Sequence, residues 1–200
     1  MQNSQVLPQA GIVTFDRAAF DEACLALMQL VLQDGEPDAL IGIRTGGLHV
    51  AQSMASACQV PVLAFTCRRP STRFKANWLK KLMTRLPRSW LDRLRMVEHK
   101  LLTRQPPRQP EEFTFDAAEI AAFQTWLKTA GPTPALVVVD DAVDSGATLA
   151  KVMAEVARLA PPTTWIRSAV ITVTTGNPQA LPRYTLYSRQ LCRFPWSLDA

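Results

Sequence analysis

The sequence predicts an α/β protein in which a parallel sheet is flanked by helices, with a basic helical insert and a small C-terminal hood. Short apolar runs alternate with segments whose apolar residues recur at helical spacing, which is the pattern of strands joined by crossover helices. Turns of small residues follow two of the apolar runs, where a strand passes into a helix. The 200 residues, 48% hydrophobic and 20% charged, suit one domain with a sizeable core or one domain plus a subdomain.

The first 66 residues predict a strand–turn–helix–strand unit behind a leading helix. Apolar residues recur at helical spacing over residues 15–33, and a Gly follows that helix. A short apolar run at 39–43 predicts a strand that leads into a glycine turn. We expect a helix at about 49–57 and a further strand at 60–66, which makes the two strands parallel.

Residues 67–110 form a basic insert. Nine Arg and four Lys in this segment oppose only Asp92 and Glu98, although the whole chain carries a net charge of only +5. Two apolar helical faces separated by Pro87 predict a helical hairpin with a basic outer surface. Four roles stay open: a cover that neutralises a polyanionic substrate, a nucleic-acid surface at 68–108, a contact with anionic membranes, or a solvated hairpin that packs on the domain or on the partner in a homodimer.

The second half continues the α/β pattern. Asp116 and Glu119 predict a capping box that opens a helix reaching about residue 129. An apolar run then predicts a strand that stops at two acids, followed by a helix over 147–159 and a strand over 166–173. The rest of the chain is rich in turn residues. We therefore assign 1–66 and 111–175 to the core domain and 176–200 to a C-terminal hood or tail.

Composition argues against several classes of protein. The apolar runs are too short to cross a membrane, and the first residues lack the basic and apolar regions of a signal peptide, which predicts a cytoplasmic protein. The four cysteines have no metal-binding spacing and predict buried or idle thiols. With only two histidines, we expect neither a zinc site nor a histidine-based catalytic triad.

The stretch 136–149, LVVVDDAVDSGATL, combines two kinds of chemistry. The carboxylates of Asp140 and Asp141 accept hydrogen bonds and repel anions. The turn that follows presents backbone N–H groups at the start of a helix, where anions bind. This turn consists of Asp144, Ser145, Gly146, Ala147 and Thr148. A sugar phosphate satisfies both halves, with its phosphate in the turn and its vicinal hydroxyls on the two acids.

This stretch resembles the 5-phosphoribosyl-1-pyrophosphate (PRPP) signature of the type I phosphoribosyltransferases, in which a hydrophobic strand leads to two acids and a small-residue turn ending in Thr. The resemblance implies the parallel-sheet fold of that family. It also implies that residues 144–148 bind the 5-phosphate of PRPP, while Asp140 and Asp141 hold the ribose hydroxyls. An ordinary strand–helix turn with a capping residue is the alternative interpretation.

A second segment, LIGIRTGG at 40–47, resembles the pyrophosphate loop of the same family. The resemblance implies that Arg44, Thr45, Gly46 and Gly47 bind the leaving pyrophosphate. It also predicts that the peptide bond between Arg44 and Thr45 is cis. The guanidinium of Arg44 suits this role because it can contact a phosphate group through two N–H groups.

The resemblance further implies a reaction. Ribose 5-phosphate is transferred from PRPP to a nitrogenous base, pyrophosphate is released, and Mg²⁺ is the cofactor, bound through PRPP with Asp140 and Asp141 as candidate protein ligands. These two acids would stabilise the oxocarbenium-like charge, and Asp144 completes the predicted catalytic set. The alternative function is a non-catalytic sensor of PRPP or a nucleotide that binds nucleic acid through the insert.

The acceptor is predicted to be purine-like. The 6-oxopurine members of the family open the phosphate turn with Asp, as Asp144 does here, and its carboxylate is proposed to handle the proton on the purine N7. A plain helix cap is the alternative role of this Asp. The segment RFPW at 193–196 resembles the ending that closes the purine pocket in bacterial xanthine–guanine members. The predicted base-binding residues are Val143, Phe194 and Trp196.

Two departures leave the identity of the base open. The xanthine–guanine members carry a Lys just after the last core strand, where this chain has Val173-Thr174-Thr175-Gly176. They also place an aromatic residue over the base where this chain has Leu191. Tyr184 and Tyr187, like the two aromatic residues of RFPW, either supply the missing stacking or pack inside the protein.

Overall fold

A computed structural model describes residues 12–56, 58–68 and 113–197. The chain divides into two compact units. The first, residues 1–67 and 115–198, contains the main sheet and the helices named below. The second, residues 68–114, lies almost entirely outside the described residues, and with it the predicted helical hairpin and the open question of what the basic insert binds.

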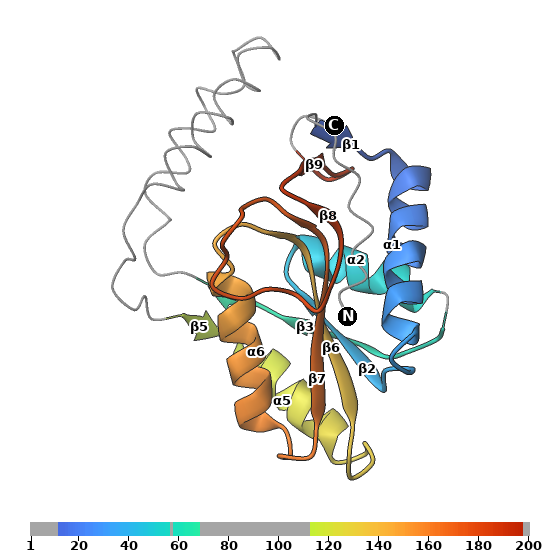
Figure 1. Cartoon of the computed structure of the whole chain (residues 1–200). Helices are drawn as coiled ribbons and strands as arrows, with labels where there is room; N and C mark the ends of the chain where they lie inside the picture. Colours follow the sequence, from blue (N-terminus) through green and yellow to red (C-terminus); the bar gives the residue numbers. More distant parts are fainter. Residues whose placement is uncertain (1–11, 57, 69–112, 198–200) are drawn as a thin grey trace. The chain divides into compact units, whose positions relative to one another are not determined.

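The main sheet has five strands, all parallel, in the order β3-β2-β6-β7-β8 (Figure 1). The strands are β2 (Ala39–Ile43), β3 (Val62–Phe65), β6 (Ala135–Val143), β7 (Trp165–Val173) and β8 (Tyr184–Ser188). The predicted α/β fold with a parallel sheet is confirmed. Because all strands run the same way, their carboxyl ends meet at one edge, which is where open sheets of this class bind ligands.

Helices cover both faces of the sheet. On one face lie α1 (Arg17–Leu32) and α2 (Gly46–Ala55), and on the other lie α5 (Ala117–Leu127) and α6 (Ala147–Leu159) (Figure 1). Each face has its own hydrophobic cluster. One cluster is centred on α1 and α2 and the other on α5 and α6, so the sheet is buried from both sides, as parallel sheets are.

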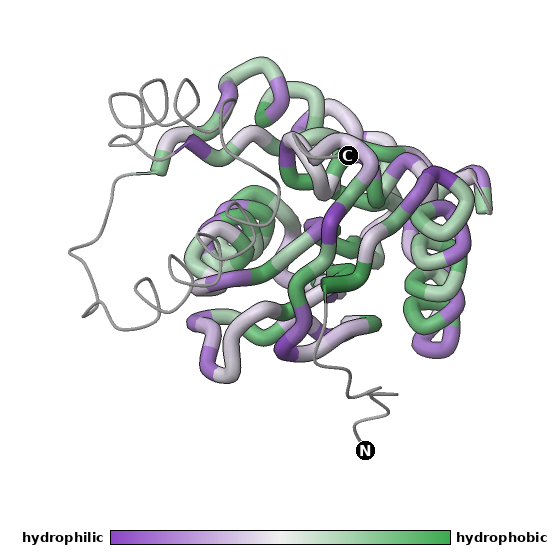
Figure 2. Tube along the Cα trace, turned by 90° about the horizontal axis from the view of Figure 1, so that it is seen from above, coloured by the Kyte–Doolittle hydropathy of each residue, from purple (hydrophilic) through white to green (hydrophobic). Residues whose placement is uncertain are grey.

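The central strands are the most apolar part of the chain. All five residues of β2 are buried, and residues 136–139 of β6 are fully inaccessible to solvent. In Figure 2 the helices around the sheet alternate between green and purple along their length, as expected for helices with one buried face. Branched apolar side chains fit such a doubly covered strand, and their burial fixes the position from which the polar loops emerge.

Two elements differ from the predicted bounds in ways that affect the site. The helix expected from about residue 49 begins at Gly46, so the glycine turn is itself the first turn of α2. The strand expected to stop at the two acids continues to Val143, because its pairing with β7 extends to Val143 opposite Val173. Asp140 and Asp141 are therefore the sixth and seventh of the nine residues of this strand.

The C-terminal segment contains more regular structure than the sequence suggested. The expectation of a turn-rich tail is corrected by β8, which forms an edge strand of the main sheet, and by β9 (Leu191–Arg193). β9 pairs in parallel with β1 (Ile12–Thr14), an unpredicted strand at the other end of the sequence. A third pairing joins β4 (Cys67–Arg68) and β5 (Thr114–Phe115).

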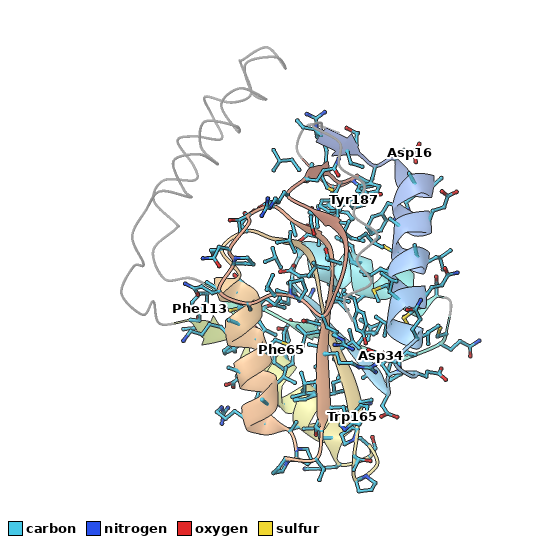
Figure 3. The ribbon with its side chains drawn as sticks, viewed as in Figure 1. Asp16, Asp34, Phe65, Phe113, Trp165 and Tyr187 are labelled. Atoms are coloured by element: carbon cyan, nitrogen blue, oxygen red, sulfur yellow. The ribbon has the colours of Figure 1, made fainter. Side chains whose placement is uncertain are left out.

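A polar network lies at the amino end of the sheet. The hydroxyl of Tyr184 donates to Asp34 Oδ2 at 2.8 Å, and Arg183 Nη2 donates to the same oxygen at 2.9 Å. Figure 3 shows Asp34 and Trp165, the first residue of β7, at the end of the sheet opposite Tyr187. This network is therefore structural.

None of the helices in the described ranges has the length and apolarity needed to span a membrane.

Candidate functional site

The carboxyl ends of β2 and β6 bring the two predicted anion loops together. These strands are neighbours, with Ala39 opposite Leu136 and Gly42 opposite Val139. The glycines that follow β2 pack directly on the acids of β6. A Cβ on Gly47 would lie 2.7 Å from the Cα of Asp140, and a Cβ on Gly46 would overlap the carboxylate of Asp141. Only glycine permits this close approach.

The predicted pyrophosphate loop has the predicted backbone. The peptide bond between Arg44 and Thr45 is cis. The Arg44 side chain is 46% exposed and its Nε donates to Glu119 Oε1 at 2.6 Å. Its backbone N–H donates to the carbonyl of Phe65, which ties the loop to the neighbouring strand β3. The loop therefore combines an accessible guanidinium with the start of helix α2.

The predicted 5-phosphate turn joins β6 to α6. Gly146 is the N-cap of α6 and has a φ of 76°, a conformation that favours glycine. A Cβ at this position would also lie 2.7 Å from the backbone nitrogen of Ala180. The carbonyl of Ser145 accepts from the N–H of Gln179 at 2.8 Å. The loop at 179–180 thus closes one side of the turn, and Gly146 is required both by its conformation and by this contact.

The starts of the four helices in the described ranges fall into two classes. Asp16 caps α1 by accepting from the N–H of Ala19, and Asp116 caps α5 by accepting from two backbone N–H groups. The N-cap residues of α2 and α6 make no side-chain cap bond and neither first turn holds an acidic residue, although the N–H of Ala147 makes a long contact of 3.4 Å with the Ser145 hydroxyl. A helix start that lacks a capping side chain keeps its N–H groups and its positive dipole end for an external anion. Both helix starts of this kind follow adjacent strands and flank Asp140 and Asp141.

The two acids form an electrostatically coupled pair. Burial raises the pKa of Asp140 well above its ordinary value, and the neighbouring charge of Asp141 raises it further. Burial also raises the pKa of Asp141, although hydrogen bonds with Asp140, with the backbone and with the indole of Trp196 oppose this. The hydrogen bond between the two side chains favours the proton on Asp140. A cationic ligand beside the pair would favour loss of that proton.

The side chain of Asp144 is held by Thr174, the residue that follows strand β7. The hydroxyl of Thr174 donates to Asp144 Oδ1, and the backbone N–H of Thr174 donates to the carbonyl of Val143 at 2.9 Å. Thr174 belongs to the segment in which the xanthine–guanine members carry their Lys. In this chain the segment therefore orients the carboxylate of Asp144 instead of supplying a cation.

The residues predicted to bind the base lie deeper than expected. Val143 is 2% exposed and Phe194 is 4% exposed, both within hydrophobic clusters. The ring of Phe194 stacks on Phe15 and on Trp196, with centroid distances of 5.7 and 5.1 Å. Both side chains therefore pack inside the protein, and their contact with a base stays a prediction.

Trp196 is the predicted base-binding residue that reaches the site. Its ring packs against that of His49, with 4.9 Å between the ring centroids, and its indole hydrogen-bonds to Asp141. The remaining aromatic candidates lie elsewhere: Tyr184 is bound to Asp34, and Tyr187 packs edge-to-face on Phe15. Trp196 therefore contacts the ribose end of the predicted site through a carboxylate.

Three residues that lie near the site were not predicted from the sequence to belong to it. Glu119 was interpreted as half of a capping box, yet its side chain binds Arg44 and Thr66. His49 follows the glycine turn by two positions and carried no motif of its own. Arg189 has a φ of 56°, donates its N–H to the carbonyl of Val173, and lies with its guanidinium over Gly176. A cation at the end of β8 leaves no recognisable signal in a single sequence.

Comparison with solved structures identifies the fold. The chain has the type I phosphoribosyltransferase fold, as the two loops predicted. It is similar to a purine phosphoribosyltransferase from Pyrococcus horikoshii Ot3, with 19% identity, coverage of 92% of both chains and a TM-score of 0.57. It is also similar to the xanthine–guanine–hypoxanthine phosphoribosyltransferase of Helicobacter pylori, with 16% identity, coverage of 94% of this chain and 95% of that chain, and a TM-score of 0.58.

A third similar structure is a hypothetical protein from Neisseria gonorrhoeae with bound ppGpp. It shares 15% identity over 96% of this chain and 93% of that chain, with a TM-score of 0.58. No protein-family model and no curated protein sequence matches the chain significantly. At these identities the similarity establishes the fold, and the chemistry has to be argued from the site.

Proposed function

We propose that this protein transfers ribose 5-phosphate from PRPP to a nitrogenous base and releases pyrophosphate. The observation that carries this proposal is the arrangement at the carboxyl edge of the sheet. Two helix starts without side-chain caps, at Gly46 and Ala147, flank a pair of carboxylates on the strand between them. PRPP has the matching order of groups, with a phosphate at one end, a ribose diol in the middle and a pyrophosphate at the other end.

Each part of PRPP has a counterpart in the site. The 5-phosphate binds the turn at 144–148, through backbone N–H groups and the dipole of α6. The ribose hydroxyls donate to Asp140 and Asp141. The pyrophosphate binds the loop at 44–47, where α2 begins and the Arg44 side chain is exposed.

The carboxylates fit a role with magnesium. Mg²⁺ prefers oxygen ligands and is commonly held by one or two carboxylates together with substrate phosphates. Within the described ranges, no group of three or more metal-ligating side chains gathers at one place. Asp140 and Asp141 would therefore hold the ion jointly with PRPP, and its charge would stabilise the departing pyrophosphate.

The acid pair stabilises positive charge at the ribose. As the bond from C1 to pyrophosphate loosens, the sugar acquires the character of an oxocarbenium ion. The raised pKa of Asp140 reflects a carboxylate whose ionised form is poorly solvated when the site is empty. A developing cation beside it favours the ionised form, so the interaction strengthens as the charge appears. The loop at 44–47 meanwhile retains the leaving group.

The acceptor in this proposal is a purine-like base. The carboxylate of Asp144 lies just after β6 and is oriented by Thr174. It is suited to accept a proton from a ring nitrogen of the base. Two of the similar structures are phosphoribosyltransferases of purines, one of them of xanthine, guanine and hypoxanthine. Their names support the purine class without specifying the base. Thr174 and Leu191 depart from the xanthine–guanine pattern, so the base has to be determined by assay.

A second candidate function is a non-catalytic sensor of PRPP or a nucleotide. The observation that favours it is the structurally similar Neisseria protein with bound ppGpp, a nucleotide that carries two separate pyrophosphate groups. The two anion-binding helix starts of this chain suit such a ligand as well. In this alternative the basic segment 68–108 binds nucleic acid.

One experiment separates the two functions. The full-length protein is incubated with PRPP and Mg²⁺ and a panel of purine and pyrimidine bases, and pyrophosphate release is measured. The enzyme proposal predicts release that depends on one base or a small group of bases. No release with any base, together with tight binding of ppGpp and salt-dependent binding of RNA, would establish the sensor instead.

A further inference from the structure

Glu119 is a hydrogen-bond acceptor for two segments of the site. One of its oxygens accepts from Arg44 Nε at 2.6 Å and from the Thr66 hydroxyl at 3.1 Å. The other oxygen accepts from the backbone N–H of Thr66 at 2.5 Å. The Glu119 side chain is only 16% exposed. A largely buried carboxylate with three donors is firmly held, since charge-assisted hydrogen bonds are the stronger ones.

The predicted capping box therefore has a different use. Asp116 accepts from the N–H of Ala118 and of Glu119, which satisfies the start of α5. The Glu119 side chain turns away from its own helix and toward the ends of β2 and β3. It is the third residue of α5, so the capped start of that helix fixes where the carboxylate lies.

The contact with Arg44 leaves much of the guanidinium available. Elsewhere in the chain, Arg158 binds Glu155 with both Nε and Nη2, at 2.8 and 2.6 Å. Arg44 uses only Nε toward Glu119, because the second oxygen of Glu119 is occupied by the N–H of Thr66. The two terminal nitrogens of Arg44 are not bound by Glu119, on a side chain that is nearly half exposed.

We propose that Glu119 is a positioning residue for pyrophosphate binding. Resting on the proposed function, Glu119 holds Arg44 so that its terminal nitrogens face the pyrophosphate group of PRPP. Glu119 does not touch the substrate. It acts by removing rotamer freedom from the arginine before the anion arrives, which lowers the entropy lost on binding.

The negative charge of Glu119 also has an opposing effect, because a carboxylate near an anion site repels the ligand. This repulsion is weakened because Glu119 is paired with Arg44 at 2.6 Å and hydrogen-bonded to Thr66. The carboxylate contacts Nε of the guanidinium, and Glu119 does not bind the terminal nitrogens that would face the ligand. Positioning therefore outweighs repulsion, and loss of the carboxylate weakens pyrophosphate binding.

Glu119→Gln tests this with little change in shape. Both carboxylate oxygens accept hydrogen bonds from N–H groups, whereas the amide of Gln has one acceptor oxygen and one donor nitrogen. One donor, of Arg44 or of Thr66, must then face an NH₂ group. The matched control is Glu155→Gln on α6, which removes a Glu–Arg pair whose Glu side chain is similarly covered, at 17% exposed.

The measurement is isothermal titration of each full-length protein with Mg²⁺-pyrophosphate and, separately, with ribose 5-phosphate. We expect Glu119→Gln to weaken pyrophosphate binding roughly tenfold, the loss typical of a charge-assisted hydrogen bond. Ribose 5-phosphate binding should stay unchanged, which also shows that the variant is folded. Glu155→Gln should change neither affinity.

Unchanged or tighter pyrophosphate binding by Glu119→Gln would overturn the inference while leaving the proposed function intact. Equal weakening of both ligands would also overturn it, since a general loss of structure affects both halves of the site. A wild-type protein that binds neither ligand would overturn the proposed function, and the role of Glu119 with it.

Discussion

The backbone of Gly46 packs against the carboxylate of Asp141 so closely that a Cβ on Gly46 would lie 2.7 Å from Asp141 Oδ1 and closer still to the rest of the group. The start of helix α2 and an acid of strand β6 thus form one surface. In the proposed function this surface holds the pyrophosphate on one side and the ribose on the other, so the contact couples the two halves of the PRPP site.

Gly46→Ala should reduce PRPP affinity about tenfold or more. The added methyl group must push the Asp141 carboxylate or the loop out of position, and overpacking of this kind costs about 1–3 kcal/mol. Titration with PRPP and Mg²⁺ measures the effect. Gly131→Ala is the control, because a Cβ at Gly131 meets no atom within 4 Å. Wild-type affinity in Gly46→Ala would show that this contact is not part of the PRPP site.

Replacing both acids should stabilise the protein while abolishing its activity. Burial raises the pKa of Asp140 and of Asp141 in the folded state. At pH values above the ordinary pKa of Asp, the folded protein therefore binds more protons than the unfolded chain does. The free energy of unfolding therefore falls as pH rises from about 4 through the raised pKa values. The double variant Asp140→Asn with Asp141→Asn lacks these ionisable groups, so it is more stable than the wild type at neutral pH. Below about pH 4 both acids are protonated in the wild type as well, and the two proteins should be equally stable.

The measurement is thermal unfolding at pH 7.5 and pH 4, with PRPP titration in parallel. Each 1 kcal/mol of added stability raises Tm by about 2–4 °C in a chain of this size. We expect a higher Tm at pH 7.5 only, with no detectable PRPP binding. Retained PRPP binding would mean that the acids do not hold the ribose, and a lower Tm at pH 7.5 would contradict the electrostatic account.

Asp144→Asn should separate chemistry from donor binding. The asparagine keeps the backbone of the phosphate turn but cannot accept a proton, so turnover with the preferred base should fall about 100-fold or more. PRPP affinity should hardly change. Thr174→Val removes only the hydroxyl that orients Asp144, and turnover should fall about fivefold, the value of one ordinary hydrogen bond.

Steady-state kinetics on both variants, with PRPP affinity measured by titration, checks this assignment. If Asp144→Asn weakens PRPP binding and leaves turnover intact, Asp144 belongs to the phosphate turn alone. That outcome would return this residue to the simpler role of a helix-start acid.

Removing the divalent cation should weaken PRPP binding and leave ribose 5-phosphate binding unchanged. Asp140 and Asp141 hold the ion only together with the pyrophosphate of PRPP in our proposal, so a ligand without pyrophosphate does not need it. Titrations with and without EDTA measure this difference. Equal PRPP affinity in both buffers would exclude a metal held between PRPP and the acid pair.

Much of the fold was predictable because the chain follows regular patterns. The apolar runs at 39–43 and 136–139 are fully buried central strands, and Asp116 caps a helix as expected. The short strand β8 was missed because its residues, YTLYS, alternate weakly and follow a turn-rich loop. Its place in the sheet is set by pairing with β7, and such a long-range contact leaves no mark on local sequence.

The site was predictable to the extent that it consists of contiguous loops. The segments at 44–47 and 144–148 each carry a compact motif, and the sheet brings them together. Contacts made by single side chains from distant elements were not predictable. Glu119 lies 75 positions from Arg44, and its place in a helix start suggested a cap. Trp196 was predicted to bind the base, and its contacts with Asp141 and His49 could not be predicted from the sequence.

The central claim is that one ligand spans both helix starts and the acid pair between them. Isothermal titration of the wild-type protein with PRPP and Mg²⁺ tests it most directly, repeated in the presence of saturating pyrophosphate and of saturating ribose 5-phosphate. We predict one PRPP per chain, with binding weakened by each half-ligand, while the two half-ligands bind together without competing. Absence of saturable PRPP binding, or competition by neither half-ligand, would contradict the account.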